Sequence, residues 1–129
     1  MEKITELYVL MDNRPKTTAE VCRILKKKRI SIFAIGIFID TGRFYVSHPE
    51  KASELLRDNG YEVEEREVIK EILPNKQGAL MELTNKLGNA DINIEYLYGA
   101  MEIQQKRGTI IMEVDKPDLA IQLFRNHTY

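Results

Sequence analysis

The chain repeats its own pattern, and this repeat constrains the fold more than any other feature of the sequence. Ile30-Ser31-Ile32 returns as Ile92-Asn93-Ile94, at an offset of 92 − 30 = 62. The stretch from Ser47 to Ala52 returns from Asp115 to Ala120 with an offset of 115 − 47 = 68, so the second copy gains six residues between its central strands. Self-similarity at a nearly constant spacing indicates one supersecondary unit that is used twice.

A unit of this size is marginal by itself. The 129 residues suffice for one compact body or for two small halves. A unit of roughly 60 residues buries only about 60% of the surface that its unfolded chain exposes. We therefore expect two units that press together, or a dimer of such pairs.

Composition and charge exclude several classes of protein. Charged residues make up 30% and hydrophobic residues 43% of the chain, and the formal net charge of −1 attracts neither nucleic acid nor a membrane surface. No apolar run reaches the roughly 18–20 residues of a transmembrane helix, and the N-terminus lacks the apolar stretch of a signal peptide. Cys22 is the only cysteine, which excludes an intrachain disulfide and cysteine-based metal clusters. No His, Asp or Glu grouping has metal-ligand spacing, so we expect no metal and no cofactor. The lack of a signal peptide, a membrane span and a disulfide leads us to expect a cytoplasmic protein.

Apolar periodicity and turn residues predict the same order of elements in both copies. In the first copy we expect strands over 4–11 and 30–39, a helix from Thr17, a return strand from Phe44, a second helix, and a strand over 61–66. In the second copy we expect a strand over 67–73, a helix over 79–89, strands over 91–102 and 109–114, and a last helix after Asp115. The order βαββαβ with both helices on one face of an antiparallel sheet is the ferredoxin-like plait. The predicted fold class is therefore α+β, with one ferredoxin-like unit over residues 1–66 and a second over 67–129.

The second unit has barely room for a fourth strand, because the chain stops at Tyr129 soon after the last helix. Two explanations are open: the second sheet keeps an open edge, or another segment or subunit covers that edge. An open edge invites pairing with other chains, so we favour a covered edge.

Short polar motifs predict where helices begin. Thr17 and Glu20 have the spacing of a capping box, in which a hydroxyl and a carboxylate three residues apart bond the first turn. Ser47 and Glu50 repeat this spacing, and Asp115 is the expected cap of the last helix.

The strand over 30–39 is apolar on both of its faces. Ile30, Ile32, Ala34 and Phe38 alternate with Phe33, Ile35, Ile37 and Ile39. A strand that is apolar on both faces is usually buried on both. We therefore predict that the sheet face away from the helices forms an interface, either with the sister unit or with a partner chain.

Three further stretches resemble the ACT domain family. Leu73-Pro74-Asn75-Lys76-Gln77-Gly78-Ala79-Leu80 resembles its signature loop, an acidic residue or Asn followed by Lys-Pro-Gly-small-Leu. Ile92-Asn93-Ile94-Glu95-Tyr96-Leu97-Tyr98 resembles the strand that follows, and Asp115-Lys116-Pro117-Asp118 resembles the family's helix cap. Both copies match, so the resemblance covers nearly the whole chain and is closest to stand-alone tandem ACT proteins. It implies regulatory binding of a small ligand, usually an amino acid, at an interface between ACT units.

The ligand-binding site that the resemblance implies consists of Asn75, Lys76, Gln77, Gly78, Ala79, Leu80, Asn93 and Ile94. Gly78 has no Cβ, so the backbone can bend sharply and a ligand can come close. The helix that starts there offers unpaired N–H groups to a carboxylate. Asn93, expected beside this loop, carries an amide that could hold an ammonium and a carboxylate together. The alternative is structural: a glycine that starts the helix and an asparagine that caps a strand end.

The first copy departs from the family pattern. The offset of the repeat places Lys16 at the position of Gly78 and Ser31 at the position of Asn93, although Pro15 is kept. The first loop is therefore degenerate, or it binds something more acidic. The second copy has lost the proline instead, and its loop carries a glutamine there.

We therefore expect a non-catalytic regulatory protein that binds an amino acid between ACT units and forms a homodimer. One alternative is a regulatory subunit of an amino-acid biosynthetic enzyme such as acetolactate synthase, whose small subunit also carries an ACT unit. Another is a structural dimer module that responds to no amino acid. An RNA-binding plait ranks last, because Leu7-Tyr8-Val9-Leu10 and Gly42-Arg43-Phe44-Tyr45-Val46 resemble its motifs only faintly, with aliphatic neighbours where a second aromatic belongs.

Overall fold

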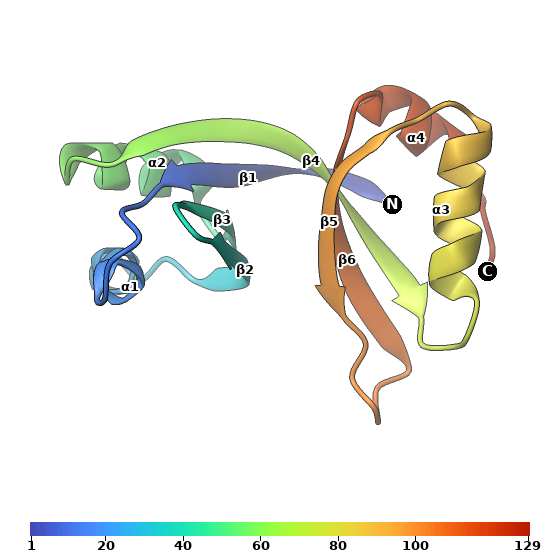
Figure 1. The fold of residues 1–129 in the computed structure, drawn as a ribbon, viewed down its shortest axis with the longest axis horizontal. Helices are drawn as coiled ribbons and strands as arrows, with labels where there is room; N and C mark the ends of the chain where they lie inside the picture. Colours follow the sequence, from blue (N-terminus) through green and yellow to red (C-terminus); the bar gives the residue numbers. More distant parts are fainter. The chain divides into compact units, whose positions relative to one another are not determined.

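Figure 1 shows the computed structural model, which describes residues 1–129. The chain divides into two compact units. The first unit comprises Thr5–Arg66, and the second comprises Glu67–Tyr129 together with Met1–Ile4.

Strands and helices alternate in the order that the sequence predicts, with helix and strand bounds that differ by a few residues. The elements are β1 (Glu2–Leu10), α1 (Thr17–Lys27), β2 (Ile32–Phe38), β3 (Thr41–Val46), α2 (Pro49–Asp58), β4 (Glu62–Pro74), α3 (Ala79–Asn89), β5 (Ile94–Ala100), β6 (Arg107–Val114) and α4 (Pro117–Leu123). No helix among them has the length and apolar character needed to cross a membrane.

Each unit has the strand order of a ferredoxin-like fold. In the first unit the strands lie in the order β2-β3-β1-β4, and in the second they lie in the order β5-β6-β4-β1. The prediction of an α+β chain built from two such units is confirmed. The predicted strands over 61–66 and 67–73 are one continuous strand, β4, which contributes to both sheets.

The start of β1 takes the place of a fourth strand in the second unit. Lys3 Nζ lies 3.4 Å from a carboxylate oxygen of Glu67. The amino group of Met1 lies 3.2 Å from Glu71, and both groups are buried. The N-terminal segment thus covers the sheet edge for which the sequence left no strand, and it belongs to the second unit, whereas the sequence predicts it in the first.

The strand pairing repeats in the two units at the offsets seen in the sequence. Ile32 pairs with Val46 in the first unit, and Ile94 pairs with Val114 in the second, where 94 − 32 = 62 and 114 − 46 = 68. The register shifts directly after these pairs in both units. Such a shift marks a β-bulge, at which two residues of one strand face one residue of its neighbour. The two sheets are therefore copies of each other down to their irregularity.

The six additional residues of the second copy lie in one hairpin loop. The ladder of β2 and β3 ends at Phe38 and Thr41, and that of β5 and β6 ends at Ala100 and Thr109. The loops between these pairs contain two residues and eight residues respectively, and 8 − 2 = 6. The insertion therefore lengthens the loop between β5 and β6 and leaves the paired strands unchanged.

Two of the predicted helix caps instead hold the starts of strands. Ser47 Oγ accepts a hydrogen bond from the backbone N–H of Ser31 at 3.0 Å, and Asp115 Oδ1 accepts one from Asn93 at 2.8 Å. Neither side chain caps the helix that follows, and Thr17 does not cap α1. The predicted caps are thus wrong, because Ser47 and Asp115 bond across the end of the sheet and Thr17 lies buried inside the first helical turn.

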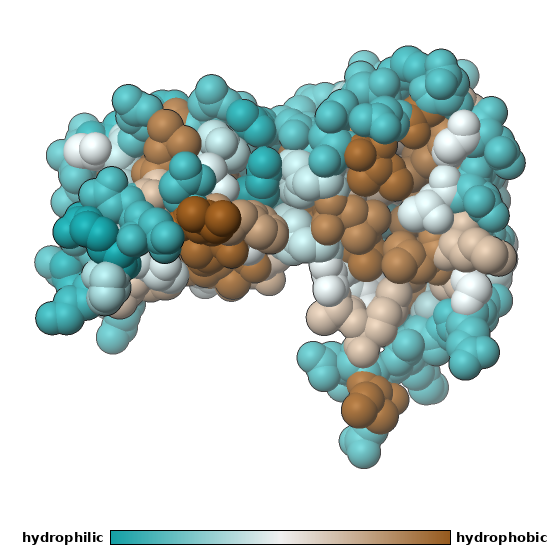
Figure 2. Space-filling view, in the orientation of Figure 1, coloured by the Kyte–Doolittle hydropathy of each residue, from teal (hydrophilic) through white to brown (hydrophobic).

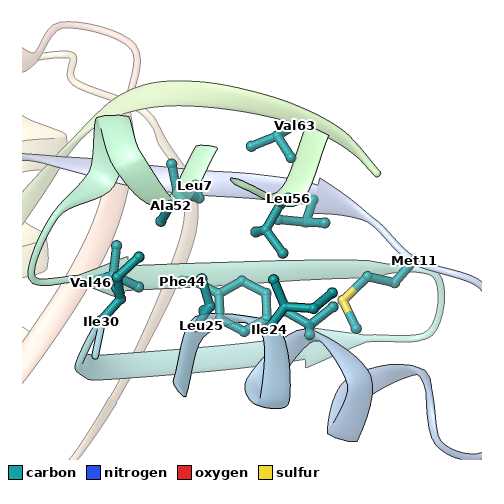
Figure 3. Close-up of a cluster of buried hydrophobic side chains, with 12 residues drawn as sticks. Leu7, Met11, Ile24, Leu25, Ile30, Phe44, Val46, Ala52, Leu56 and Val63 are labelled. Atoms are coloured by element: carbon teal, nitrogen blue, oxygen red, sulfur yellow. The ribbon is translucent and has the colours of Figure 1, made fainter. Parts of the chain in front are cut away.

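Each unit has its own hydrophobic core under its two helices. Figure 3 shows side chains of α1 and α2 meeting those of the strands in the first unit. This core contains Leu7, Val9, Met11, Val21, Ile24, Leu25, Ile30, Phe44, Val46, Ala52, Leu56 and Val63. The core of the second unit contains Ile69, Leu73, Leu83, Leu87, Ile92, Ile110, Met112, Val114, Ala120 and Phe124. The buried residues of α1 are Thr17, Val21, Ile24 and Leu25.

β2 leaves much of its apolar surface exposed. The bulge breaks the simple alternation that the sequence predicts, so Ile35 pairs with Phe44, which is buried in the core. Phe33 is nevertheless 60% exposed, Ile35 44% and Ile37 40%. Figure 2 shows hydrophobic surface in the region of the hairpin of β2 and β3. The predicted burial of this strand on both faces is therefore not achieved within the chain, and burial against a partner stays a prediction.

Candidate functional site

The predicted ligand loop forms a bend at the N-terminus of α3. The loop runs over Asn75–Gly78, between the end of β4 and the start of α3. Gly78 has φ 90° and ψ −14°, a left-handed conformation that a residue without Cβ adopts most easily. A Cβ built on Gly78 would meet no atom within 4 Å, so the bend is open to an approaching ligand.

The first turn of α3 has no side-chain cap. The first N–H groups of a helix lack intrahelical acceptors and give this end a partial positive charge. Lys76 is exposed in the same loop and adds a full positive charge. The loop can therefore bind a carboxylate group.

A groove of about 730 Å³ leads from this loop along α3. Its lining includes Lys76, Gln77 and Gly78, which the sequence predicts as site residues. The remaining lining residues are Met81, Glu82, Asn85, Lys86, Asn89, Ala90 and Leu123, which sequence reasoning missed. The spacing of Met81, Asn85 and Asn89 by four residues is the signal that could have identified this helix face. The groove combines cationic, anionic, amide and apolar side chains.

The C-terminal tail holds two charged side chains of the groove. His127 Nδ1 lies 2.8 Å from Lys86 Nζ, and His127 Nε2 lies 3.3 Å from Glu82 Oε1. Lys86 Nζ also lies 4.9 Å from the ring centroid of Phe124. A basic and an acidic group are thus fixed beside each other on the groove wall.

Asn75 has a structural role, because its polar groups form hydrogen bonds with the loop between β5 and β6. Asn75 Nδ2 donates to the carbonyl oxygens of Glu102 and Gln105 at 2.7 and 2.8 Å. The backbone N–H of Asn75 donates to the carbonyl oxygen of Lys106 at 2.8 Å. These carbonyl groups belong to the loop with the six additional residues. Asn75 therefore anchors the enlarged hairpin to the candidate ligand loop, a role that the sequence did not reveal.

Asn93 lies at the other end of the sheet from Gly78. β4 and β5 both run antiparallel to β6, so they are parallel to each other, and β5 begins far from the start of α3 (Figure 1). Pro74 pairs with Arg107 at the start of β6, whereas Asn93 bonds Asp115 just past its end. Eight residues of a strand span roughly 25 Å at about 3.3 Å per residue. The prediction that Asn93 lies beside the Gly78 loop is therefore wrong within one unit.

The other three predicted residues have different environments. Ala79 is buried at the start of α3, and Ile94 packs partly buried against the core. Leu80, the next residue of the helix, is 44% exposed. The buried stripe of α3 instead runs through Ala79, Leu83 and Leu87.

The polar groups around the corresponding loop of the first unit satisfy one another. Lys16 is the N-cap of α1, and a hollow of about 240 Å³ nearby is lined by Asp12, Arg14, Glu20 and Tyr61 among others. Arg14 Nη2 lies 2.9 Å from Asp12 Oδ2, and the Tyr61 hydroxyl donates to Glu20 Oε1 at 2.8 Å. Burial, together with this hydrogen bond, raises the pKa of Tyr61 to about 12. The first loop is therefore more closed than the second.

No metal-binding arrangement accompanies these loops. The chain contains no group of three or more His, Cys, Asp or Glu side chains that could hold a metal ion. Cys22 is a free, half-buried thiol on α1. The candidate ligand site is the groove along α3.

Comparison with known proteins identifies the family. The family described as ACT domain pair matches residues 2–127. This chain belongs to that family. The ACT domain pair spans both units, and the resemblance recognised from the sequence is confirmed. No curated protein matches this chain.

Several solved structures share the fold of this ACT domain pair. Protein BT0572 from Bacteroides thetaiotaomicron is 27% identical with a TM-score of 0.85, over 95% of this chain and 86% of that chain. The regulatory subunit of aspartate kinase from Thermus thermophilus is 17% identical with a TM-score of 0.69, over 93% of this chain and 88% of that chain. E. coli aspartokinase III in complex with lysine and aspartate is 16% identical with a TM-score of 0.60, over 95% of this chain and 31% of that chain.

Proposed function

We propose that this ACT domain pair is a non-catalytic regulatory protein that binds an amino acid at the loop Asn75–Gly78. The open bend at Gly78, which leads into the groove along α3, is the observation that supports the proposal. An amino acid presents a carboxylate, an ammonium group and a side chain. The uncapped helix start and Lys76 suit the carboxylate, Glu82 suits the ammonium group, and Met81 suits an apolar side chain.

A second copy of the chain would complete this site. Asn93 is exposed and too far from Gly78 to share a ligand within one unit. In a homodimer, Asn93 of one copy can approach the loop of the other, so that the ligand bridges two ACT units. The ligand then favours the bridged arrangement by as much as its affinity differs between the two states.

A regulatory role also implies an enzyme partner. The fold matches 88% of a chain that is itself a regulatory subunit, that of Thermus thermophilus aspartate kinase. We therefore extend the proposal to a catalytic chain of amino-acid biosynthesis, and we place a kinase of this type before acetolactate synthase. Purification of the tagged protein from its host, followed by mass spectrometry, should recover such an enzyme. If no such enzyme is recovered, the proposed enzyme partner is wrong, whereas the proposed amino-acid site is not affected.

A thermal-shift screen against the twenty amino acids tests the site itself. A ligand present at 100 times its Kd stabilises the native state by about 2.7 kcal/mol, which raises Tm. Gly78→Val should abolish this rise, because the new side chain fills the bend. Gly60→Val is the matched control, since Gly60 has the same φ of 90° and the same open surroundings but lies in the first unit. A purely structural dimer module predicts no response to any amino acid, and equal responses of the two variants contradict the proposed site.

A further inference from the structure

The groove along α3 contains a lysine whose charge is not neutralised by a carboxylate. Lys86 is half-buried on the groove wall. Its ammonium group lies 2.8 Å from His127 Nδ1 and 4.9 Å from the ring centroid of Phe124, and it forms no ion pair with a carboxylate. An imidazole and an aromatic face fix the position of an ammonium group but leave its net charge in place. Lys86 is therefore an oriented cation that can still bind an anion.

His127 separates Lys86 from Glu82. A glutamate and a lysine four residues apart on a helix ordinarily have the spacing of an ion pair. Here the two ring nitrogens of one imidazole contact them instead, with Nδ1 2.8 Å from Lys86 Nζ and Nε2 3.3 Å from Glu82 Oε1. Because an ammonium group only donates, Nδ1 accepts and the ring proton is on Nε2. The ring is therefore neutral, and both charges stay available to a ligand.

The first unit lacks this arrangement, so the duplicated fold does not require it. The offset of 62 residues places Ile24, a core residue, at the position of Lys86. It places Glu20 at the position of Glu82, but Glu20 accepts a hydrogen bond from the Tyr61 hydroxyl at 2.8 Å. The second unit alone therefore has a cation at this point of its helix.

Three binding groups follow one another along the groove. They are the start of α3 at Gly78, the carboxylate of Glu82 and the ammonium group of Lys86, at intervals of four residues. Residues at this interval lie on the same face of a helix, about 6 Å apart along its axis. The groove thus offers a site for an anion, then a site for a cation, and then a second site for an anion.

We propose that the amino acid bound in this groove is an α-amino dicarboxylic acid. Its α-carboxylate binds at the start of α3, its ammonium group binds Glu82, and its side-chain carboxylate binds Lys86. Its methylene groups lie against Met81, which also lines the groove. In such a molecule the ammonium group is attached between the two carboxylates, which is the order of the three sites. The inference rests on the proposed function, because it assigns a ligand class to the same groove.

Calorimetric titration of the full chain at constant ionic strength compares ligands that differ by one group. L-Aspartate and L-glutamate share the proposed chemistry, and each is compared with its own amide and with L-leucine. At least one of the two acids should bind roughly tenfold more tightly than its amide, as expected for a hydrogen bond between two charged groups. Succinate, which has two carboxylates but no ammonium group, should also bind roughly tenfold more weakly than that acid.

Lys86→Met tests the second anion site, because it removes the ammonium group and keeps an unbranched side chain. The Kd of the dicarboxylic acid should rise roughly tenfold and that of its amide should rise less, so the preference for the acid disappears. This preference is a ratio for two ligands of one variant, so a lower stability of the variant does not imitate its loss. Lys26→Met is the matched control, since Lys26 is an exposed lysine on α1 of the first unit, and it should keep the preference.

The results distinguish the ligand class from the proposed function. The inference is overturned if an amide, leucine or succinate binds as tightly as the dicarboxylic acids, or if Lys86→Met keeps the preference for the acid. In each of these cases, amino-acid binding by the wild type still supports the proposed function. If no amino acid binds to the wild type, the proposed function is wrong as well.

Discussion

Lys16 and Gly78, which the repeat places at equivalent positions, adopt the same left-handed backbone conformation at the N-caps of α1 and α3. The φ and ψ angles are 77° and −13° at Lys16, and 90° and −14° at Gly78. The bend therefore belongs to the duplicated fold and forms with or without glycine. What glycine changes is the space above the bend, which it leaves free in the second unit alone.

The first prediction follows from the cost of a left-handed side-chain residue. Lys16→Gly should stabilise the protein, and Gly78→Ala should destabilise it, each by about 1 kcal/mol, because a Cβ in this conformation is penalised by roughly 1–2 kcal/mol and glycine loses some of that advantage through chain entropy. Urea denaturation measures both changes. A loss of stability in Lys16→Gly would show that the lysine side chain has a stabilising contact.

The second prediction concerns the anchor of the enlarged hairpin. Asn75→Ala should destabilise the protein by about 1–2 kcal/mol, because two carbonyl groups lose a donor. Asn75→Asp should be worse, because a carboxylate would face the same two carbonyl oxygens. Hydrogen exchange of residues 101–106 should rise in both variants. The matched control is Asn13→Asp, at the equivalent position of the first unit, where the hairpin turn is only two residues long.

The third prediction concerns a buried carboxylate. The Tyr129 hydroxyl donates to Glu71 Oε2 at 2.8 Å, and Glu71 is 6% exposed. Tyr129→Phe should cost about 1.5–3 kcal/mol, as expected for a hydrogen bond to a charged group. In a Glu71→Gln background the same change should cost less. A double-mutant cycle by thermal denaturation measures this difference, and additive effects would show that the two groups are not coupled.

The fourth prediction is a loss of stability at alkaline pH. The pKa of Tyr61 rises from its ordinary value of 10.0 to about 12, chiefly through burial and then through its hydrogen bond to Glu20. The folded state holds this proton more tightly than the unfolded state, so the stabilisation is complete below pH 10 and is lost as the pH rises through about 12. Burial and Glu71 raise the pKa of Tyr129 in the same direction.

The contribution of Tyr61 can be separated with a variant that cannot ionise. In Tyr61→Phe, the melting temperature should decline less steeply over this alkaline window than in the wild type. The remaining decline then reports the other tyrosines. Identical slopes for the two proteins would contradict the role assigned to the bond between Tyr61 and Glu20.

The sequence predicts the duplicated fold well because the repeat shows directly which residues of the two units are equivalent. Its two offsets reappear as equivalent strand pairs, Ile32 with Val46 and Ile94 with Val114. Prediction fails where a residue could serve two purposes. Ser47 and Asp115 have the chemistry of helix caps, but both bond the backbone at the start of a neighbouring strand. Local spacing does not reveal that choice.

The candidate site is only partly predictable for a related reason. Lys76, Gln77 and Gly78 line the groove because they are contiguous with the bend. The family resemblance places Asn93 beside them, whereas parallel strands put it at the far end of the sheet. Asn75 also carries the chemistry of a ligand-binding residue, yet its amide is used by carbonyl groups much further along the chain. Such long-range contacts leave no periodic signal.

The position of Met1–Ile4 within the second unit has a consequence for how this protein can be divided. A gene divided between residues 66 and 67 would leave the first unit, Thr5–Arg66, whole in one fragment and would separate Met1–Ile4 from the rest of the second unit. The upstream fragment would carry Met1–Ile4, which belong to the second unit, and the downstream fragment would lack these residues. During synthesis, the ion pair between Lys3 and Glu67 can form only after the whole of Thr5–Arg66 has been made. The second unit is therefore built from two segments that are far apart in the chain, although the sequence suggests two consecutive units.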